Sequence, residues 1–123
     1  MTNQPIVPHW IQGREDLGSS TRTAEVYDPA LGEVTKLVAL ANSADINAAI
    51  EVASAAFPSW AETSLARRQA VLFNFRELLN RKKAELAEII TAEHGKVLSD
   101  ALGEITRGQE VVEFACGMPQ LLK

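Results

Sequence analysis

Residues 64 to 93 contain neither glycine nor proline, and their apolar side chains recur at helical spacing. This pattern is typical of amphipathic helices that bury one face. The apolar stripe comprises Leu65, Leu72, Phe75, Leu79, Leu86, Ile89 and Ile90. We predict one long helix, or two helices bent near Asn80. Gly95 is expected to end it, because glycine readily adopts the left-handed conformation of a helix C-terminus.

Two further helices are predicted on either side of this stretch. Ser43 is a good N-cap for a helix over residues 44–56. Pro58 is expected to end that helix, since the residue before a proline disfavours the helical conformation. Thr63 or Ser64 is expected to cap the central helix, and a last helix is predicted from about residue 99 to residue 117, closed by Pro119.

The first 42 residues have a different character, with β-formers separated by turn residues. Short strands are predicted over residues 9–11, 24–28 and 33–41, and the last two flank an Asp-Pro-Ala-Leu-Gly turn. Trp10 and Trp60 are expected to pack in the core or against a hairpin rather than to stack on a ligand. The chain is therefore predicted to be a β-hairpin region, residues 1–42, followed by a region of three or four α-helices, residues 43–122.

Charge and composition exclude several classes of function. The formal net charge is -4, and the most extended basic cluster is Arg81-Lys82-Lys83, so we expect no nucleic-acid partner. No apolar run approaches the roughly 18 residues that cross a bilayer. Met1–Gly13 lacks the pattern of a signal peptide, so a cytoplasmic location is expected. A single cysteine and two widely separated histidines, His9 and His94, give no support to a metal site.

The sequence has no glycine-rich phosphate loop and no G-x-S-x-G nucleophile elbow. Cys116 could be a nucleophile, but a small buried residue on the last helix is the favoured interpretation. Residues 93–96, Glu-His-Gly-Lys, could be catalytic. A helix C-terminus is favoured, where His and Lys suit the negative end of the helix dipole.

Arg107 is the candidate residue for which a purely structural role is least convincing. It lies between Thr106 and Gly108 in a helix whose neighbouring residues are expected to be buried, and a guanidinium there needs an anionic partner. That partner could be Glu104 or Glu110 of the same helix, which spacing alone favours, or the carboxylate of a substrate.

Several strings, taken in order, resemble the aldehyde dehydrogenase superfamily. Trp-Ile-Gln-Gly at residues 10–13 and Tyr-Asp-Pro-Ala-Leu-Gly-Glu-Val at residues 27–34 resemble the family's opening hairpin. The helical strings from Ser43 to Lys96 follow the same family order. Residues 101–108 and 112–119 resemble the CoA-acylating branch, the methylmalonate-semialdehyde dehydrogenases.

The resemblance implies an α/β fold in the full-length family, of which residues 1–123 would form the N-terminal part of the NAD-binding domain. It implies NAD-dependent oxidation of malonate or methylmalonate semialdehyde, with CoA, to acetyl-CoA or propionyl-CoA and CO₂, in a homo-oligomer. The family's catalytic cysteine and coenzyme-binding segments are expected beyond residue 123, so this segment is expected to hold no catalytic, cofactor-binding or metal-binding residue. It is expected to bind neither NAD nor CoA alone, and to be inactive.

The resemblance also shifts the interpretation of Arg107, because the arginine of that helix is associated in this family with the substrate's carboxylate. Two alternatives remain open. The chain could be a small α-helical interaction protein without catalytic activity, or a remnant that binds full-length subunits.

Overall fold

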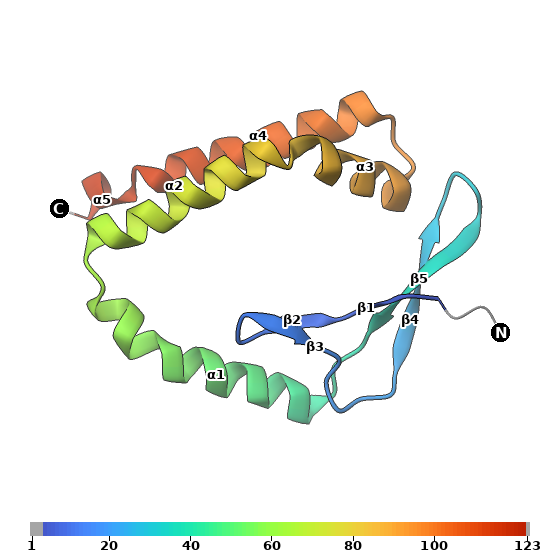
Figure 1. Ribbon diagram of the computed structural model, residues 1–123, viewed down its shortest axis with the longest axis horizontal. Helices are drawn as coiled ribbons and strands as arrows, with labels where there is room; N and C mark the ends of the chain where they lie inside the picture. Colours follow the sequence, from blue (N-terminus) through green and yellow to red (C-terminus); the bar gives the residue numbers. More distant parts are fainter. Residues whose placement is uncertain (1–3, 123) are drawn as a thin grey trace. The chain divides into compact units, whose positions relative to one another are not determined.

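The computed structural model describes residues 4–122; residues 1–3, which begin the segment Met1–Gly13, and residue 123 lie outside the described residues. The chain forms two compact units, Met1–Glu62 and Thr63–Lys123. The strands and the first helix belong to the first unit, and the other helices to the second (Figure 1). The change from strands to helices thus comes near residue 42, whereas the boundary between compact units comes after residue 62.

Unit 1 holds two small sheets. One has three strands in the order β1 (Ile6–Val7), β5 (Glu33–Ala39) and β4 (Thr23–Asp28), with β1 parallel and β4 antiparallel to β5. In the turn between β4 and β5 the Asp28 carboxylate accepts from the Ala30 N–H at 2.9 Å, and Gly32 has a φ of 70°. The predicted hairpin is confirmed.

The second sheet of unit 1 is a hairpin of β2 (His9–Ile11) and β3 (Arg14–Asp16). Its two turn residues, Gln12 and Gly13, both have positive φ values, 57° and 75°. Such a two-residue turn matches the twist of paired strands, but it requires the left-handed region at both positions. Gln12 therefore adopts a conformation that side chains with a Cβ disfavour.

Helix α1 (Ser43–Glu62) differs from the prediction at both ends. The side chain that caps it belongs to Asn42, whose Oδ1 accepts from the N–H groups of Ala44 and Asp45 at 2.8 and 3.0 Å. The predicted end at Pro58 is wrong, because the helix continues to Glu62. A proline removes one backbone hydrogen bond of a helix, and the alanine-rich sequence that precedes Pro58 favours a helix at this position.

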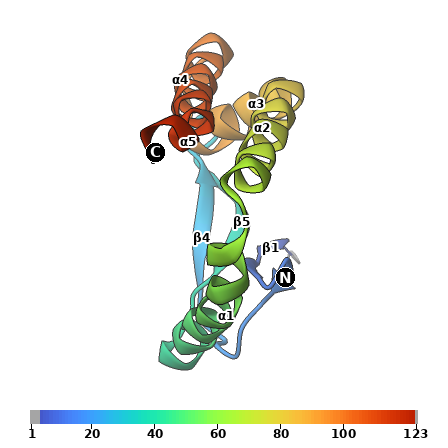
Figure 2. The same ribbon diagram turned by 90° about the vertical axis from the view of Figure 1, so that its left-hand side faces the viewer.

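Unit 2 consists of α2 (Leu65–Arg81), α3 (Lys83–His94), α4 (Leu98–Cys116) and a four-residue helix, α5 (Met118–Leu121). Of the two predicted alternatives, two helices with a break near Asn80 are confirmed, because α2 and α3 are separated at Lys82. Ser64 caps α2, as predicted. Helix α4 packs against both α2 and α3 (Figure 2). Pro119 does not end a helix; it lies in the first turn of α5, where its missing N–H costs no hydrogen bond. No helix within residues 4–122 is long and apolar enough to cross a membrane.

The described core is small. Its buried apolar side chains are Ala39, Ala87, Ala101 and Cys116, and no large side chain is fully buried among residues 4–122. The expectation that the tryptophans pack in a core is wrong: Trp10 is 71% exposed and Trp60 is 46% exposed. The apolar faces that the sequence pattern predicts are present. That of α1 is exposed, whereas the stripe of α2 and α3 is mostly half-buried, with Phe75 and Ile89 exposed.

Candidate functional site

Arg107 lies on α4, and its side chain is exposed. It forms no hydrogen bond or ion pair with any residue in the described range 4–122. Neither Glu104 nor Glu110, the two same-helix partners that spacing suggests, binds its guanidinium. An apolar cavity of about 290 Å³ lies next to α4. Ile105 and Gly108, which are close to Arg107 in the sequence, line it.

Glu104 is bound instead by Lys96, from the connection between α3 and α4. The Lys96 Nζ donates to the Glu104 Oε1. This hydrogen bond lowers the pKa of Glu104 below its usual value, against an opposing effect of partial burial. The positive charges of Lys96, His94 and Arg107 lower the pKa further.

Side-chain hydrogen bonds hold α4 against the other helices of unit 2. The Arg76 guanidinium reaches Glu113 Oε1 through two nitrogens, at 2.8 and 2.7 Å. On α3, the Lys83 Nζ donates to Thr106 Oγ1 at 2.6 Å. Helix α4, which carries Arg107, is therefore held to α2 by Arg76 and to α3 by Lys83.

The other candidates of unit 2 take structural positions. Cys116 is buried at the end of α4, and its carbonyl oxygen accepts from the Gln69 Nε2 at 2.7 Å. The helix C-terminus predicted at residues 93–96 is confirmed, because α3 ends at His94 and Gly95 has a φ of 82°. A helix end accounts for this motif without catalysis.

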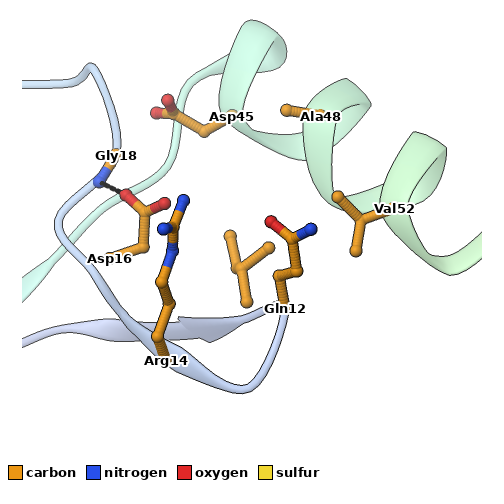
Figure 3. A pocket seen from close by; sticks show the side chains of 8 residues that line it. Gln12, Arg14, Asp16, Gly18, Asp45, Ala48 and Val52 are labelled. Atoms are coloured by element: carbon orange, nitrogen blue, oxygen red, sulfur yellow. Dashed lines mark hydrogen bonds between the residues drawn. The ribbon is translucent and has the colours of Figure 1, made fainter.

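Unit 1 contains a cavity of about 220 Å³ between the β2–β3 hairpin and α1 (Figure 3). Gln12, Arg14, Asp16 and Asp45 are the polar side chains that line it (Figure 3). Both carboxylates have backbone donors: Asp16 accepts from the Gly18 N–H at 2.8 Å, and Asp45 accepts from residues 19 and 42. Asp45 ties the loop after the hairpin to the start of α1, whereas the Asp16 bond lies within that loop.

Asp45 is the residue in this cavity that the sequence analysis missed. It accepts hydrogen bonds from the backbone of Asn42 and from the backbone and hydroxyl of Ser19. These bonds, that from Asn42 first, lower the pKa of Asp45 from 3.8 to about 2. The signal was present in the spacing Asn42-x-x-Asp45, a reciprocal arrangement in which each side chain accepts from the other's backbone.

The described junction between β5 and α1 does not fit a dinucleotide phosphate. Such a group binds where a glycine-rich turn leads from a strand into a helix N-terminus. The chain passes from β5 into the N-terminus of α1 at this junction. Asn42 caps the free N–H groups of α1, and the Asp45 carboxylate lies beside them. Within the described range, no group of three His, Cys, Asp or Glu side chains is placed to hold a metal ion.

Comparison with known proteins covers nearly the whole chain. The sequence model of the aldehyde dehydrogenase family matches residues 17–123. Malonate-semialdehyde dehydrogenase of Pseudomonas aeruginosa is 44% identical over 115 residues, 94% of this chain and 23% of that protein. Malonate-semialdehyde dehydrogenase 1 of Shouchella clausii is 43% identical over 94% of this chain and 24% of its own.

Solved structures give the same result for the fold. A Sinorhizobium meliloti protein described as a methylmalonate-semialdehyde dehydrogenase, crystallised with NAD, is 46% identical with a TM-score of 0.95. The match covers 100% of this chain and 25% of that one. For methylmalonate-semialdehyde dehydrogenase of Oceanimonas doudoroffii the identity is 42% and the TM-score 0.94, over 98% and 24% of the two chains.

The chain therefore spans about a quarter of the length of the relatives that it matches. It corresponds to an N-terminal segment of them, with strands followed by helices as the resemblance implies. Similarity at this level, over nearly all of its residues, shows that the chain belongs to the aldehyde dehydrogenase family.

Proposed function

We propose that this chain is part of an NAD-dependent oxidoreductase that acts on malonate or methylmalonate semialdehyde. With CoA, the complete enzyme would yield acetyl-CoA or propionyl-CoA and release CO₂. The names of the relatives support this substrate class, and NAD is bound in the Sinorhizobium meliloti relative. Within the chain itself, the proposal depends on one observation, the exposed and unpaired guanidinium of Arg107.

A semialdehyde acid carries a carboxylate a short distance from its reactive carbonyl group. A guanidinium recognises a carboxylate through two parallel hydrogen bonds, which fix the orientation of the substrate as well as its affinity. Arg107 has these donors free, and α4 is held by contacts to α2 and α3. We assign Arg107 the role of anchor for the substrate's carboxylate.

The same proposal assigns no catalytic step to this segment. Cys116 is buried, and the start of α1 is closed to a phosphate by Asn42 and Asp45. The catalytic cysteine and the sites for NAD and CoA then belong to the remaining three quarters of the enzyme. A cytoplasmic location, assembly into a homo-oligomer and the absence of nucleic-acid or membrane partners stay predictions.

A hybrid enzyme tests the anchor role. In it, this chain replaces the matching quarter of the Sinorhizobium meliloti protein, to which it is 46% identical. Arg107→Leu is expected to lower kcat/KM for malonate semialdehyde by about 10- to 100-fold, the usual cost of a lost charged hydrogen bond. With propanal, which has no carboxylate, the change is expected to stay within about twofold.

Arg81→Leu is the matched control, since Arg81 is also an exposed arginine of unit 2. It should leave both substrates unaffected. An equal loss of activity with malonate semialdehyde and propanal on Arg107→Leu would contradict the anchor role. The 123-residue chain alone is expected to give no turnover above a control without protein.

A further inference from the structure

Glu104 and Arg107 are three residues apart on α4, a spacing at which opposite charges on a helix meet and pair. The acidic residue precedes the basic one, which is the favourable order, whereas Glu110 follows Arg107 in the less favourable order. Glu104 is thus the internal competitor for the Arg107 guanidinium. It nevertheless forms its ion pair elsewhere.

The partner that Glu104 takes is Lys96, in the connection that precedes α4. The Lys96 side chain is only 18% exposed and that of Glu104 is 39% exposed, so this pair is better shielded from solvent than the Arg76–Glu113 and Lys82–Glu85 pairs. The shielded ammonium holds the carboxylate. Arg107, one turn further along the helix, acts on Glu104 only through its charge and forms no hydrogen bond or ion pair with residues 4–122.

From this arrangement we infer that Lys96 is a positioning residue for substrate binding, because it occupies Glu104 and leaves the Arg107 guanidinium available to the substrate's carboxylate. The inference rests on the proposed role of Arg107. Without Lys96, the Glu104 carboxylate would turn to Arg107 and compete with the substrate.

The availability of Arg107 can be measured directly in the 123-residue chain. Phenylglyoxal modifies free guanidinium groups, and peptide mass spectrometry gives the rate for each arginine, with exposed Arg81 as the internal reference. In Lys96→Met, which keeps most of the aliphatic stem, Arg107 is expected to react roughly 1.5- to twofold more slowly, the effect of one exposed helical ion pair. The double variant Lys96→Met/Glu104→Gln is expected to regain the wild-type rate.

Two controls separate this effect from a loss of structure. Lys82→Met removes another ion pair of unit 2, Lys82–Glu85 at 2.6 Å, and should leave the Arg107 rate unchanged. Lys96→Arg keeps the charge and should behave as wild type. If Lys96→Met loses helical circular dichroism, Lys96→Gln takes its place. An unchanged Arg107 rate in the folded variant overturns the inference.

The hybrid enzyme then connects availability to function. Lys96→Met is expected to raise KM for malonate semialdehyde roughly 1.5- to twofold at low ionic strength and to leave propanal unaffected. Glu104→Gln is expected to reverse the effect. If Arg107→Leu is selective for the carboxylate substrate and Lys96→Met is not, the inference about Lys96 fails alone. If Arg107→Leu is not selective, the proposed anchor fails, and with it the role of Lys96.

Discussion

The backbone N–H and the hydroxyl of Ser19 both donate to the same oxygen of Asp45, each at 2.7 Å. The other Asp45 oxygen accepts from the Asn42 N–H at 2.9 Å. One carboxylate therefore fixes the loop after the β2–β3 hairpin to the first turn of α1. Because these bonds favour the ionised form, the stability of unit 1 depends on pH.

Asp45→Asn is expected to lower the free energy of unfolding of unit 1 at neutral pH but not at strongly acidic pH. The pKa of Asp45 is about 2 in the folded chain, below its usual 3.8, so the stabilising effect is complete above about pH 4. It is lost as the pH falls toward 2, where the folded chain also becomes protonated. Urea unfolding followed by tryptophan fluorescence reports unit 1 alone, since Trp10 and Trp60 both lie there.

The difference between wild type and Asp45→Asn should close as the pH falls from 4 to 2. Ser19→Ala removes one donor and should give a smaller difference over the same pH range. A difference that persists unchanged at pH 2 would show that the Asp45 charge is not what stabilises this region.

Gly18→Ala is expected to destabilise unit 1 by more than about 1 kcal/mol, the cost of the left-handed region for a residue with a Cβ. Gly18 has a φ of 72°, and a Cβ there would lie 2.9 Å from the Asp45 Cγ. The hydrogen bonds of Asp45 prevent this side chain from moving away freely. Gly32→Ala, also in unit 1, is the control and should cost less, because Gly32 has a φ of 70° but nothing lies within 4 Å of a Cβ there. Equal stability of Gly18→Ala and wild type in urea unfolding would contradict the geometry.

Gln12→Asn is expected to stabilise unit 1 by up to about 1 kcal/mol, because asparagine tolerates the left-handed region and an Asn-Gly pair favours this hairpin turn. Gln12 has a φ of 57°. Gln12→Ala keeps the Cβ and serves as the control for loss of the side chain. The fluorescence-detected urea midpoint should rise for the asparagine variant only. A similar rise in both would assign the effect to the side chain rather than to the backbone.

Several elements could be predicted because local signals determine them. Ser64 accepts a hydrogen bond from the Arg67 N–H and begins α2, and Gly95 ends α3 in the left-handed conformation. The Asp28–Gly32 turn likewise follows from its own residues. Each of these signals acts within a few residues, so the sequence pattern contains all the information needed.

The end of α1 could not be predicted reliably, because the helix-breaking effect of Pro58 competes with the helix-favouring residues near it. Pro58 costs a hydrogen bond, yet the residues around it favour a helix strongly enough for α1 to reach Glu62. The N-cap of α1 also differs from the prediction. Asn42 takes the position that Ser43 was expected to take, because Asp45 returns a hydrogen bond to it.

The state of Arg107 could not be predicted from spacing, because it depends on a third residue. Spacing places Glu104 within reach of Arg107, but Lys96 approaches Glu104 across the α3–α4 connection. The sequence does not show whether the Glu104 carboxylate pairs with Lys96 or with Arg107. Only the folded arrangement of unit 2 shows that the guanidinium is left free.

Cys116 is expected to react with a thiol reagent only when unit 2 opens, because it is buried and 4% exposed. It is the only cysteine in the chain, so the reaction reports unit 2 alone. Gln69→Ala removes the hydrogen bond to the Cys116 carbonyl and should speed the reaction roughly fivefold, the effect of about 1 kcal/mol. Gln120→Ala, at an exposed position of α5, should have no effect. A wild-type rate equal to that of a free thiol would contradict the burial of Cys116.

The 123-residue chain is expected to self-associate through the apolar face of α1. Ile46, Ile50 and Phe57 are 53%, 60% and 67% exposed. The first two line, with Trp10, an open groove of about 510 Å³. Exposed apolar surface of this kind drives association in water.

In sizing chromatography the chain should therefore elute above its monomer mass of 13.4 kDa. Replacing Ile46, Ile50 and Phe57 by glutamine should shift it toward the monomer, because each replacement removes apolar surface that association would bury. Asn47→Gln with Glu51→Gln alters exposed polar residues of the same helix and should leave the elution unchanged. A sharp monomer peak with cooperative melting for the wild-type chain would show instead that its apolar faces are satisfied within one molecule.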